Sequence, residues 1–255
     1  MSGSTDVIHT NRIALVTGGS SGIGREIAIE LAKAGFSVVL NFSKSTDSAN
    51  SVKDEILAMG GDAHLFLADI TREAEVERLF AFMETEFTHI DVLINNAGLY
   101  IPDDIENQGI DSWNKTLGLN LTAKMLCTKY AVPLLRKSMA PRIINIASRA
   151  AKRPLRETAA YCCAATGIVM LTQVSALELA KYNIHVNSVS PGLTRTPMTE
   201  AVDTEEDFLD YTRKNPSKRM GEPKDIAKTV LFLISSDADF INGENLNVSG
   251  GSLLL

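Results

Sequence analysis

Short apolar segments alternate along this chain with longer segments of helical period, and this alternation restricts the fold more than any other feature. Residues 22–34 and 72–88 repeat apolar side chains every three or four positions, which predicts helices. Strands that are apolar throughout and separated by helices indicate a parallel sheet covered on both faces. The segments expected to be strands are RIALVTG (12–18), SVVLNF (37–42), AHLFLAD (63–69), DVLINNAG (91–98), RIINIAS (142–148), HVNSVSPG (185–192) and NLNV (245–248).

The length and composition are those of one globular unit. The chain has 255 residues, of which 45% are hydrophobic and 22% charged, and no repeat or change of composition divides it. We therefore predict an α/β fold, a single domain over residues 12–255 with a doubly wound parallel sheet of about seven strands. Residues 1–11 are expected to form a flexible N-terminus, and residues 193–221 a lid over the substrate.

The net charge of −6 argues weakly against a nucleic-acid partner, because phosphate binding favours a basic surface. The first residues, MSGSTDVIHTN, contain no apolar core, and we find no run of about 18 apolar residues, so we expect neither secretion nor a membrane span. The expected location is the cytoplasm. The three cysteines, Cys127, Cys162 and Cys163, make no disulfide framework, and a bridge between the adjacent Cys162 and Cys163 is sterically difficult, so all three are expected to be free thiols. No metal site is predicted.

A glycine-rich turn, 17-TGGSSGIGREIA-28, joins the first expected strand to the first expected helix. Glycines allow the backbone to approach a pyrophosphate closely, and the start of a helix offers free N–H groups and a partial positive charge. The spacing of Gly18, Gly22 and Gly24 differs from the general G-x-G-x-x-G pattern, and a tight turn without a ligand is the alternative. The position between a strand and an amphipathic helix favours phosphate binding.

The second expected strand ends in 41-NFSKS-45, and this ending bears on the choice of cofactor. A site that prefers NAD usually carries an acid there to hold the ribose 2′-hydroxyl, and the same acid would repel the 2′-phosphate of NADP. Asn41, Phe42 and Ser43 carry no charge, and Lys44 is able to reach a phosphate. We therefore expect NADP (NADPH) rather than NAD, although Lys44 can equally be read as a solvated loop residue.

Taken together, these motifs resemble those of the short-chain dehydrogenase/reductase family, and most closely the 3-oxoacyl-acyl-carrier-protein reductases. The resemblance covers residues 12–252 and implies a Rossmann fold and an oxidoreductase acting on a carbonyl/hydroxyl pair. Near the end, 243-GENLNVSGG-251 has Ser249 where the family usually has an aspartate. The motifs are TGGSSGIG, Asp69 in ADI, NNAG at 95–98, Asn120 in LNLTA, Ser148 in NIAS, Tyr161 after 12 intervening residues, and SPGLTRTPM at 190–198.

The resemblance also implies roles for individual residues. In the family a tyrosine protonates the carbonyl oxygen, a serine orients it and an asparagine anchors a water relay; the matching residues here are Tyr161, Ser148 and Asn120. Beside Asn41 and Lys44, the cofactor-binding residues would be Gly18, Ser20, Ile23 and Gly24 at the pyrophosphate, Asp69 and Ile70 at the adenine, Asn96, Ala97 and Gly98 at the ribose, and Pro191, Gly192 and Thr196 at the nicotinamide.

One position departs from the family pattern. The family places a lysine four residues after the tyrosine, where it binds the nicotinamide ribose and keeps the tyrosine acidic, but this chain has Ala165. Another cation can substitute, and Arg149, Lys152 and Arg153 lie between Ser148 and Tyr161. Alternatively, the scaffold performs a non-redox reaction such as dehydration or isomerisation, or the chain is a pseudoenzyme, a binding subunit or an engineered variant.

The preferred interpretation is an NADP(H)-dependent ketoreductase with an atypical active site. Basic residues in 149–156 and in the expected lid suit a carboxylate, a coenzyme A phosphate or an acidic carrier protein, or are simply solvated. The expected substrate is thus a small carbonyl or acyl compound, either free or bound to a carrier protein. The resemblance also implies a homotetramer, paired through long helices expected at about 111–138 and 159–182 and through the C-terminal strands. Cys162 and Cys163 are expected to pack rather than react.

Overall fold

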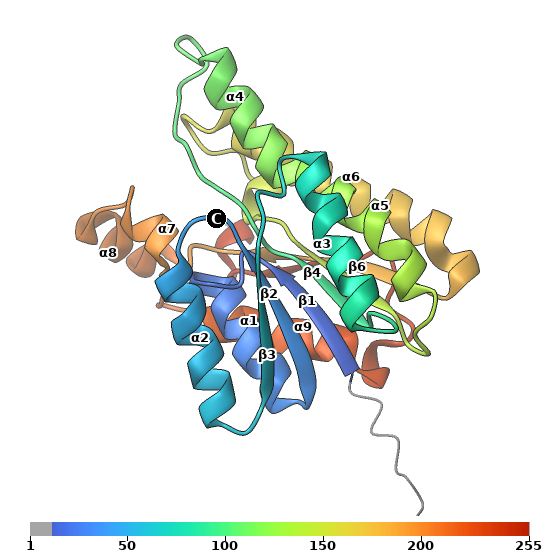
Figure 1. The fold of residues 1–255 in the computed structure, drawn as a ribbon. Helices are drawn as coiled ribbons and strands as arrows, with labels where there is room; N and C mark the ends of the chain where they lie inside the picture. The colour runs from blue at the N-terminus through green and yellow to red at the C-terminus, as the bar shows by residue number, and fades with distance from the viewer. Residues whose placement is uncertain (1–11, 255) are drawn as a thin grey trace, which may run out of the picture.

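A parallel sheet of seven strands forms the centre of the computed structural model, which describes residues 12–254 (Figure 1). The spatial order is β3-β2-β1-β4-β5-β6-β7, and every neighbouring pair is parallel. The predicted fold class and strand number are therefore confirmed. The strands are β1 (Arg12–Thr17), β2 (Phe36–Phe42), β3 (Asp62–Leu67), β4 (Val92–Asn95), β5 (Arg142–Ile146), β6 (His185–Pro191) and β7 (Asn245–Val248).

Helices cover both faces of the sheet, as the uninterrupted apolar strands predicted. Alternate residues of β1 show the two layers: Ala14 and Val16 belong to one apolar core, and Ile13 and Leu15 to the other. The first core includes α1 (Gly22–Lys33), α2 (Thr46–Ala58) and α9 (Pro223–Ile234), and the second includes α3 (Glu73–Glu86), α5 (Ala123–Leu135) and part of α6 (Ala159–Leu179).

The direction of winding reverses between β1 and β4. From β1 the chain proceeds outward through β2 to β3, then returns to form β4 on the other side of β1. The carboxyl ends of β1 and β4 therefore diverge into separate connections and leave a crevice, which is the place where open α/β sheets bind ligands. The candidate site lies at this edge of the sheet.

The helix expected over 111–138 is interrupted. It consists of α4 (Ile110–Leu117), a π-helical segment η1 (Gly118–Thr122) and then α5. A π-helical turn contains one more residue than an α-helical turn, and such turns occur often at functional sites. Its centre is Asn120, whose side chain is held by the backbone of a distant loop residue, Leu99. This tertiary contact accounts for the break in an otherwise regular helical pattern.

The segment from α6 through η3 (Ala180–Tyr182) is long and apolar enough to cross a membrane, judged by length and composition alone. Within its 24 residues, a window of 18 residues has a mean hydropathy of 1.5, and 39% of that window is buried. Polar residues interrupt this segment, so the chain still has no unbroken run of about 18 apolar residues, and the expectation that it does not span a membrane stays a prediction. One face of α6 packs on β6 and η1, and the opposite face exposes Met170, Val174 and Leu177. A helix that packs in the core of a globular protein passes the same test of length and composition.

The remaining elements lie around the carboxyl edge of the sheet or at the end of the chain. The expected lid contains α7 (Pro197–Glu200) and α8 (Glu205–Lys214), closed at its base by a bridge between Thr194 and Gly221. The 3-10 turns are η2 (Arg149–Ala151), η4 (Ser236–Ala238) and η5 (Ser252–Leu254). The expectation for residues 1–11 lies outside the described residues.

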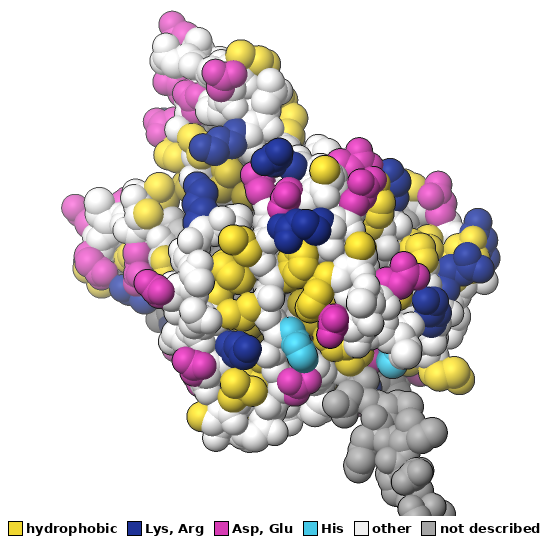
Figure 2. Space-filling model, viewed as in Figure 1, with side chains coloured by type: hydrophobic (Ala, Val, Ile, Leu, Met, Phe, Trp, Pro, Cys, Tyr) yellow, Lys and Arg dark blue, Asp and Glu magenta, His cyan; other side chains and the backbone are white. Residues whose placement is uncertain are grey.

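Charges of both signs are mixed on the face of the molecule shown in Figure 2. Lysine and arginine side chains lie among aspartates and glutamates, without a continuous basic area on this face. A mixed surface of this kind does not attract a polyanion strongly. The view agrees with the weak argument against nucleic acid that the net charge provided.

Some positions of the glycine turn leave no space for a side chain, so substituting a glycine there should destabilise the protein. A Cβ atom at Gly24 would lie 2.2 Å from the Gly18 carbonyl oxygen, whereas nothing lies within 4 Å of a Cβ at Gly118. Gly24→Ala should lower the free energy of unfolding by about 1–3 kcal/mol through overpacking. Gly118→Ala, in right-handed helical backbone, should be neutral or slightly stabilising. Urea denaturation of both variants tests this, and equal stabilities would contradict it.

Candidate active site

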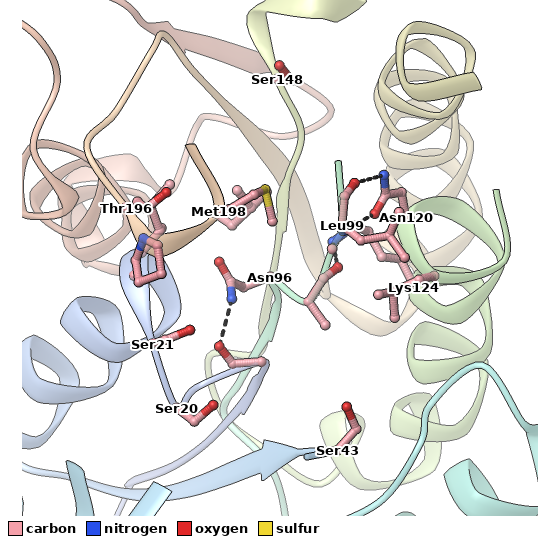
Figure 3. Close-up of a pocket in the computed structure, with 18 of the residues that line it drawn as sticks. Ser20, Ser21, Ser43, Asn96, Leu99, Asn120, Lys124, Ser148, Thr196 and Met198 are labelled. Atoms are coloured by element: carbon pink, nitrogen blue, oxygen red, sulfur yellow. Dashed lines mark hydrogen bonds between the residues drawn. The ribbon is translucent and has the colours of Figure 1, made fainter. Parts of the chain in front are cut away.

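A cavity of about 310 Å³ lies at the carboxyl edge of the sheet (Figure 3). Figure 3 shows it reaching from Ser43, just after β2, to Ser148, just after β5. All three predicted catalytic residues and all but one of the predicted cofactor-binding residues contribute to its wall. They are Asn120, Ser148, Tyr161, Gly18, Ser20, Ile23, Asn41, Lys44, Asp69, Ile70, Asn96, Ala97, Gly98, Pro191, Gly192 and Thr196.

The glycine turn offers backbone donors to the cavity. Gly18 and Gly22 have positive φ angles of 64° and 54°, which side chains disfavour, and the turn leads directly into α1. Ser21 occupies the N-cap position without a side-chain capping bond, and the first turn of α1 contains no acid. Free N–H groups at such a helix start fit an anionic phosphate. Gly24 is the one predicted cofactor-binding residue that does not line the cavity. It lies behind the turn and packs against Gly18.

Thr17 and Asn96 join the turn to the end of β4. The Asn96 side-chain amide donates to the carbonyl oxygens of Thr17 at 3.0 Å and Gly18 at 3.1 Å. In return, the Thr17 hydroxyl accepts from the backbone N–H groups of Asn96 at 3.0 Å and Ala97 at 3.1 Å. The side chain of Asn96 therefore shapes the cavity wall, and Figure 3 shows it turned towards the glycine turn.

Three polar side chains lie at the end of β2: one is hydrogen-bonded within the protein, and two are exposed. Asn41 is buried, and its amide donates to the carbonyl oxygens of Ala68 at 3.1 Å and Phe66 at 3.4 Å. Ser43 and Lys44 are exposed and line the cavity. Of the residues expected to select the cofactor, Lys44 is thus placed to meet a phosphate, while Asn41 stabilises the strand ends.

Asp69 lies at the same end of the cavity, just beyond β3. Its carboxylate accepts hydrogen bonds from the Thr71 backbone N–H at 3.1 Å and the Thr71 hydroxyl at 2.7 Å. These bonds fix the carboxylate beside the buried Ile70. The pair forms a polar edge next to an apolar surface, which suits an aromatic base.

Tyr161 and Ser148 meet at the opposite end. Burial raises the pKa of the Tyr161 phenol, the neighbouring Ser148 side chain opposes the shift, and Cys162 and Arg149 add smaller effects of opposite sign. Tyr161 also packs edge-to-face on Tyr100, with ring centroids 5.1 Å apart. A phenol of ordinary pKa, about 10, already keeps its proton at neutral pH, and burial shifts the pKa of Tyr161 further in that direction, so its neutral form is available as a proton donor.

Asn120 is fixed through its side chain. Its Oδ1 accepts from the Leu99 backbone N–H and its Nδ2 donates to the Leu99 carbonyl oxygen, both at 2.8 Å (Figure 3). Both ends of the amide are thereby bonded to the loop that follows β4. Asn120 therefore holds that loop against η1.

Ala165 lies one helical turn beyond Tyr161 on α6, is 3% exposed and lines the cavity. The loop cations proposed to replace a lysine there do not line it. Arg149 stacks over Tyr211 with its guanidinium 5.4 Å from the ring centroid, and Arg153 donates to the Ser252 carbonyl oxygen at 2.8 Å. Lys152 is exposed. Substitution by this loop is not supported, apart from the small effect of Arg149 on the Tyr161 pKa.

Lys124 is the cation that the sequence analysis missed. It is 2% exposed, lines the cavity from α5, and donates from Nζ to the carbonyl oxygens of Asn95 at 2.8 Å and Ala97 at 3.0 Å. The available signal was its position four residues after Asn120, which puts both on one helix face. Burial lowers the pKa of Lys124 to about 7.

The three cysteines are free, as expected. Cys127 is buried, and Cys162 is partly buried with its Sγ 3.2 Å from the Thr158 hydroxyl. Cys163 is exposed on this chain, so the expectation that it packs was wrong for the isolated chain. Within residues 12–254, no three His, Cys, Asp or Glu side chains lie close enough together to hold a metal ion.

Comparison with known proteins identifies the family. Residues 18–252 match a family described as enoyl-(acyl carrier protein) reductase. The chain is 37% identical over 246 residues to a 3-oxoacyl-[acyl-carrier-protein] reductase of Synechocystis, covering 96% of this chain and 98% of that protein. The chain belongs to the short-chain dehydrogenase/reductase family. It is accordingly an oxidoreductase, and the resemblance deduced from the motifs is confirmed.

Other similar proteins are named for different substrates. A (2S)-[(R)-hydroxy(phenyl)methyl]succinyl-CoA dehydrogenase subunit of Thauera aromatica is 36% identical over 245 residues, covering 96% of this chain and 97% of that protein. A solved structure from Beutenbergia cavernae, proposed to be an NAD(P)-dependent gluconate 5-dehydrogenase and containing NADP, superposes with a TM-score of 0.90. It is 32% identical and the match covers 96% of this chain and 97% of that one.

Proposed function

We propose that this protein is an NADPH-dependent ketoreductase. The observation that carries the proposal is a single cavity with a phosphate-binding turn at one side and Tyr161, Ser148 and Asn120 at the other. The free helix start fits a pyrophosphate, and the Asp69–Ile70 edge fits a nucleobase. NADPH would supply a hydride to the carbonyl carbon of the substrate.

The protein's own groups would then manage the carbonyl oxygen. The neutral phenol of Tyr161 donates its proton to that oxygen as negative charge develops on it. The Ser148 hydroxyl lies beside Tyr161 and orients the same oxygen by a hydrogen bond. Asn120 keeps the Leu99 loop in place, so that the wall of the cavity is set before substrate binds.

The names of similar proteins support a 3-oxoacyl thioester as the substrate class. The Synechocystis protein is named for a 3-oxoacyl group on acyl carrier protein, and the Thauera protein for a coenzyme A ester. Both are thioesters of a large polar carrier. A thioester whose acyl end enters the cavity while its carrier stays outside would match a cavity that is open to solvent.

The decisive experiment is the oxidation of NADPH in the presence of a short 3-oxoacyl thioester. Tyr161→Phe should bind NADPH like the parent but reduce the ketone about 10²-fold more slowly or worse, because general acid catalysis is lost. Tyr100→Phe is the matched control, since it removes a hydroxyl from the ring that packs on Tyr161 and should leave the rate nearly unchanged. Nicotinamide fluorescence and absorbance at 340 nm, the standard NADPH band, follow binding and turnover.

Two results would decide against this proposal. If the parent binds NADPH but Tyr161→Phe reduces the ketone equally fast, the assigned acid is wrong. If the parent binds neither NADPH nor NADH, the alternative of a non-redox enzyme or pseudoenzyme on this scaffold is favoured. That alternative has no supporting geometry beyond Ala165 at the cavity wall.

We further propose a preference for NADPH over NADH, supported by Ser43 and Lys44 at the end of β2 and by the NADP in the Beutenbergia structure. Ser43→Asp should reduce the ratio of NADPH to NADH affinity by about tenfold or more, because its carboxylate repels the 2′-phosphate. Ser48→Asp adds the same charge outside this cavity and should change the ratio little. Competition binding measures it, and an unchanged ratio in Ser43→Asp would refute the placement.

We also propose a homotetramer in the cytoplasm. Met170, Val174 and Leu177 follow one another at spacings of four and three residues on the exposed side of α6, where an apolar stripe favours self-association. Met170→Glu should lower the mass measured by light scattering. Met139→Glu, the same change in an exposed loop, should leave it unaltered. A parent protein that is monomeric at micromolar concentration would rule out the assembly.

A further inference from the structure

Two cationic side chains are buried in the described residues, 12–254, and their surroundings differ. Arg142 is 4% exposed and has a carboxylate partner, Asp239, with Nη2 and Oδ1 2.5 Å apart. Lys124 is 2% exposed and has no ion-pair partner among the described residues. Burying an ammonium without a carboxylate partner is costly, so burial favours the neutral amine of Lys124.

The contacts of Lys124 account for only part of its bonding capacity. An ammonium group has three donors, and two of them reach the carbonyl oxygens of Asn95 and Ala97. The same side chain forms part of the cavity wall beside the turn 95–98 (Figure 3). One donor is therefore left for a ligand that lies against this turn.

Burial lowers the pKa of Lys124 to about 7, and the Cys127 thiol acts weakly in the opposite direction. The thiol itself is neutral at ordinary pH, because burial raises its pKa to about 12. Near neutral pH the ammonium and the neutral amine are then both populated in the free protein. A ligand oxygen that accepts a hydrogen bond from the ammonium would raise that pKa and favour the charged form.

We propose that Lys124 is a cofactor-binding residue that donates its third N–H to a ribose hydroxyl of the dinucleotide, where the ribose lies against the turn 95–98. This inference rests on the proposed function, since it concerns how the same cavity holds its cofactor. It assigns to α5 the cation that the family resemblance led us to expect on α6 at Ala165.

The test removes the positive charge at position 124 and keeps a hydrogen-bond donor there. Lys124→Gln retains a neutral N–H for the two carbonyl oxygens, so a purely structural role is largely preserved. Lys129→Gln is the matched control on the same helix, because Lys129 is exposed and bonded to Glu73 away from the cavity. Near pH 6, Lys124→Gln should bind NADPH about tenfold more weakly than the parent, and Lys129→Gln should bind it equally well.

The pH dependence of NADPH affinity shows whether the charge of Lys124 or only the shape of its side chain contributes to binding. If the ammonium of Lys124 increases NADPH affinity about tenfold, binding of NADPH raises the pKa of Lys124 by about one unit. This increase in affinity is therefore present below about pH 7 and lost by about pH 9. The affinities of the parent and of Lys124→Gln for NADPH should therefore converge near pH 9. The other ionisable groups on the cavity wall are Lys44, Asp69 and Tyr161, which Lys124→Gln leaves in place.

The results distinguish this inference from the function on which it rests. Equal NADPH affinity of the parent and Lys124→Gln near pH 6, or a difference that persists unchanged to pH 9, overturns the role of Lys124 and leaves the ketoreductase intact. If Lys124→Gln does not fold, a parent affinity that is constant between these pH values overturns it as well. Failure of the parent to bind NADPH at all overturns both.

Discussion

The hydrogen bonds between Thr17 and the Asn96–Ala97 turn hold the site together. They connect β1 and β4 where the winding of the sheet reverses and where the two chain connections would otherwise separate. Because the glycine turn follows Thr17 directly, its position relative to β4 is set by these bonds. These bonds therefore fix the floor of the crevice at the carboxyl edge, where open α/β sheets bind ligands.

A second set of buried polar contacts carries this order across to α6. The Asn95 side chain donates to Asn145 Oδ1 at 2.9 Å, Asn145 donates to the Thr172 hydroxyl at 2.9 Å, and Thr172 donates to the Ile168 carbonyl oxygen at 2.8 Å. The chain of bonds thus runs from β4 through β5 to the helix that bears Tyr161. Polar groups in a closed core specify one arrangement, because any shift leaves them without partners.

Much of this architecture could be read from the sequence because it depends on local patterns. Apolar strands, helical periods and the glycine turn each lie within a short segment, and their order fixes the sheet. The ends of the strands were harder to predict. The strand expected over 91–98 ends at Asn95, because the backbone N–H and the side chain of Asn96 form hydrogen bonds with Thr17 and do not continue the pairing with β5. That partner lies 79 residues away.

The same reasoning explains why the π-helical turn and Lys124 were not foreseen. The turn depends on the contact between Asn120 and Leu99, 21 residues apart, and nothing in the segment LGLNLTAKM indicates it. Lysines on helices are usually solvated, so a lysine in a helical segment is normally assigned to the surface. Only the spacing from Asn120 hinted that this one faces inward.

Ala165 and Lys124 are best understood as one feature of the cavity. Both lie on its wall, both are buried, and the only carboxylate on that wall, among the described residues, is Asp69, which is already bonded to Thr71. A second ammonium at position 165 would repel that of Lys124 in surroundings where water screens charge poorly. An alanine there avoids this repulsion. If Lys124 holds the ribose, a lysine on α5 supplies the contact that Ala165 on α6 lacks, and the absence of a lysine four residues after Tyr161 no longer argues against a reductase.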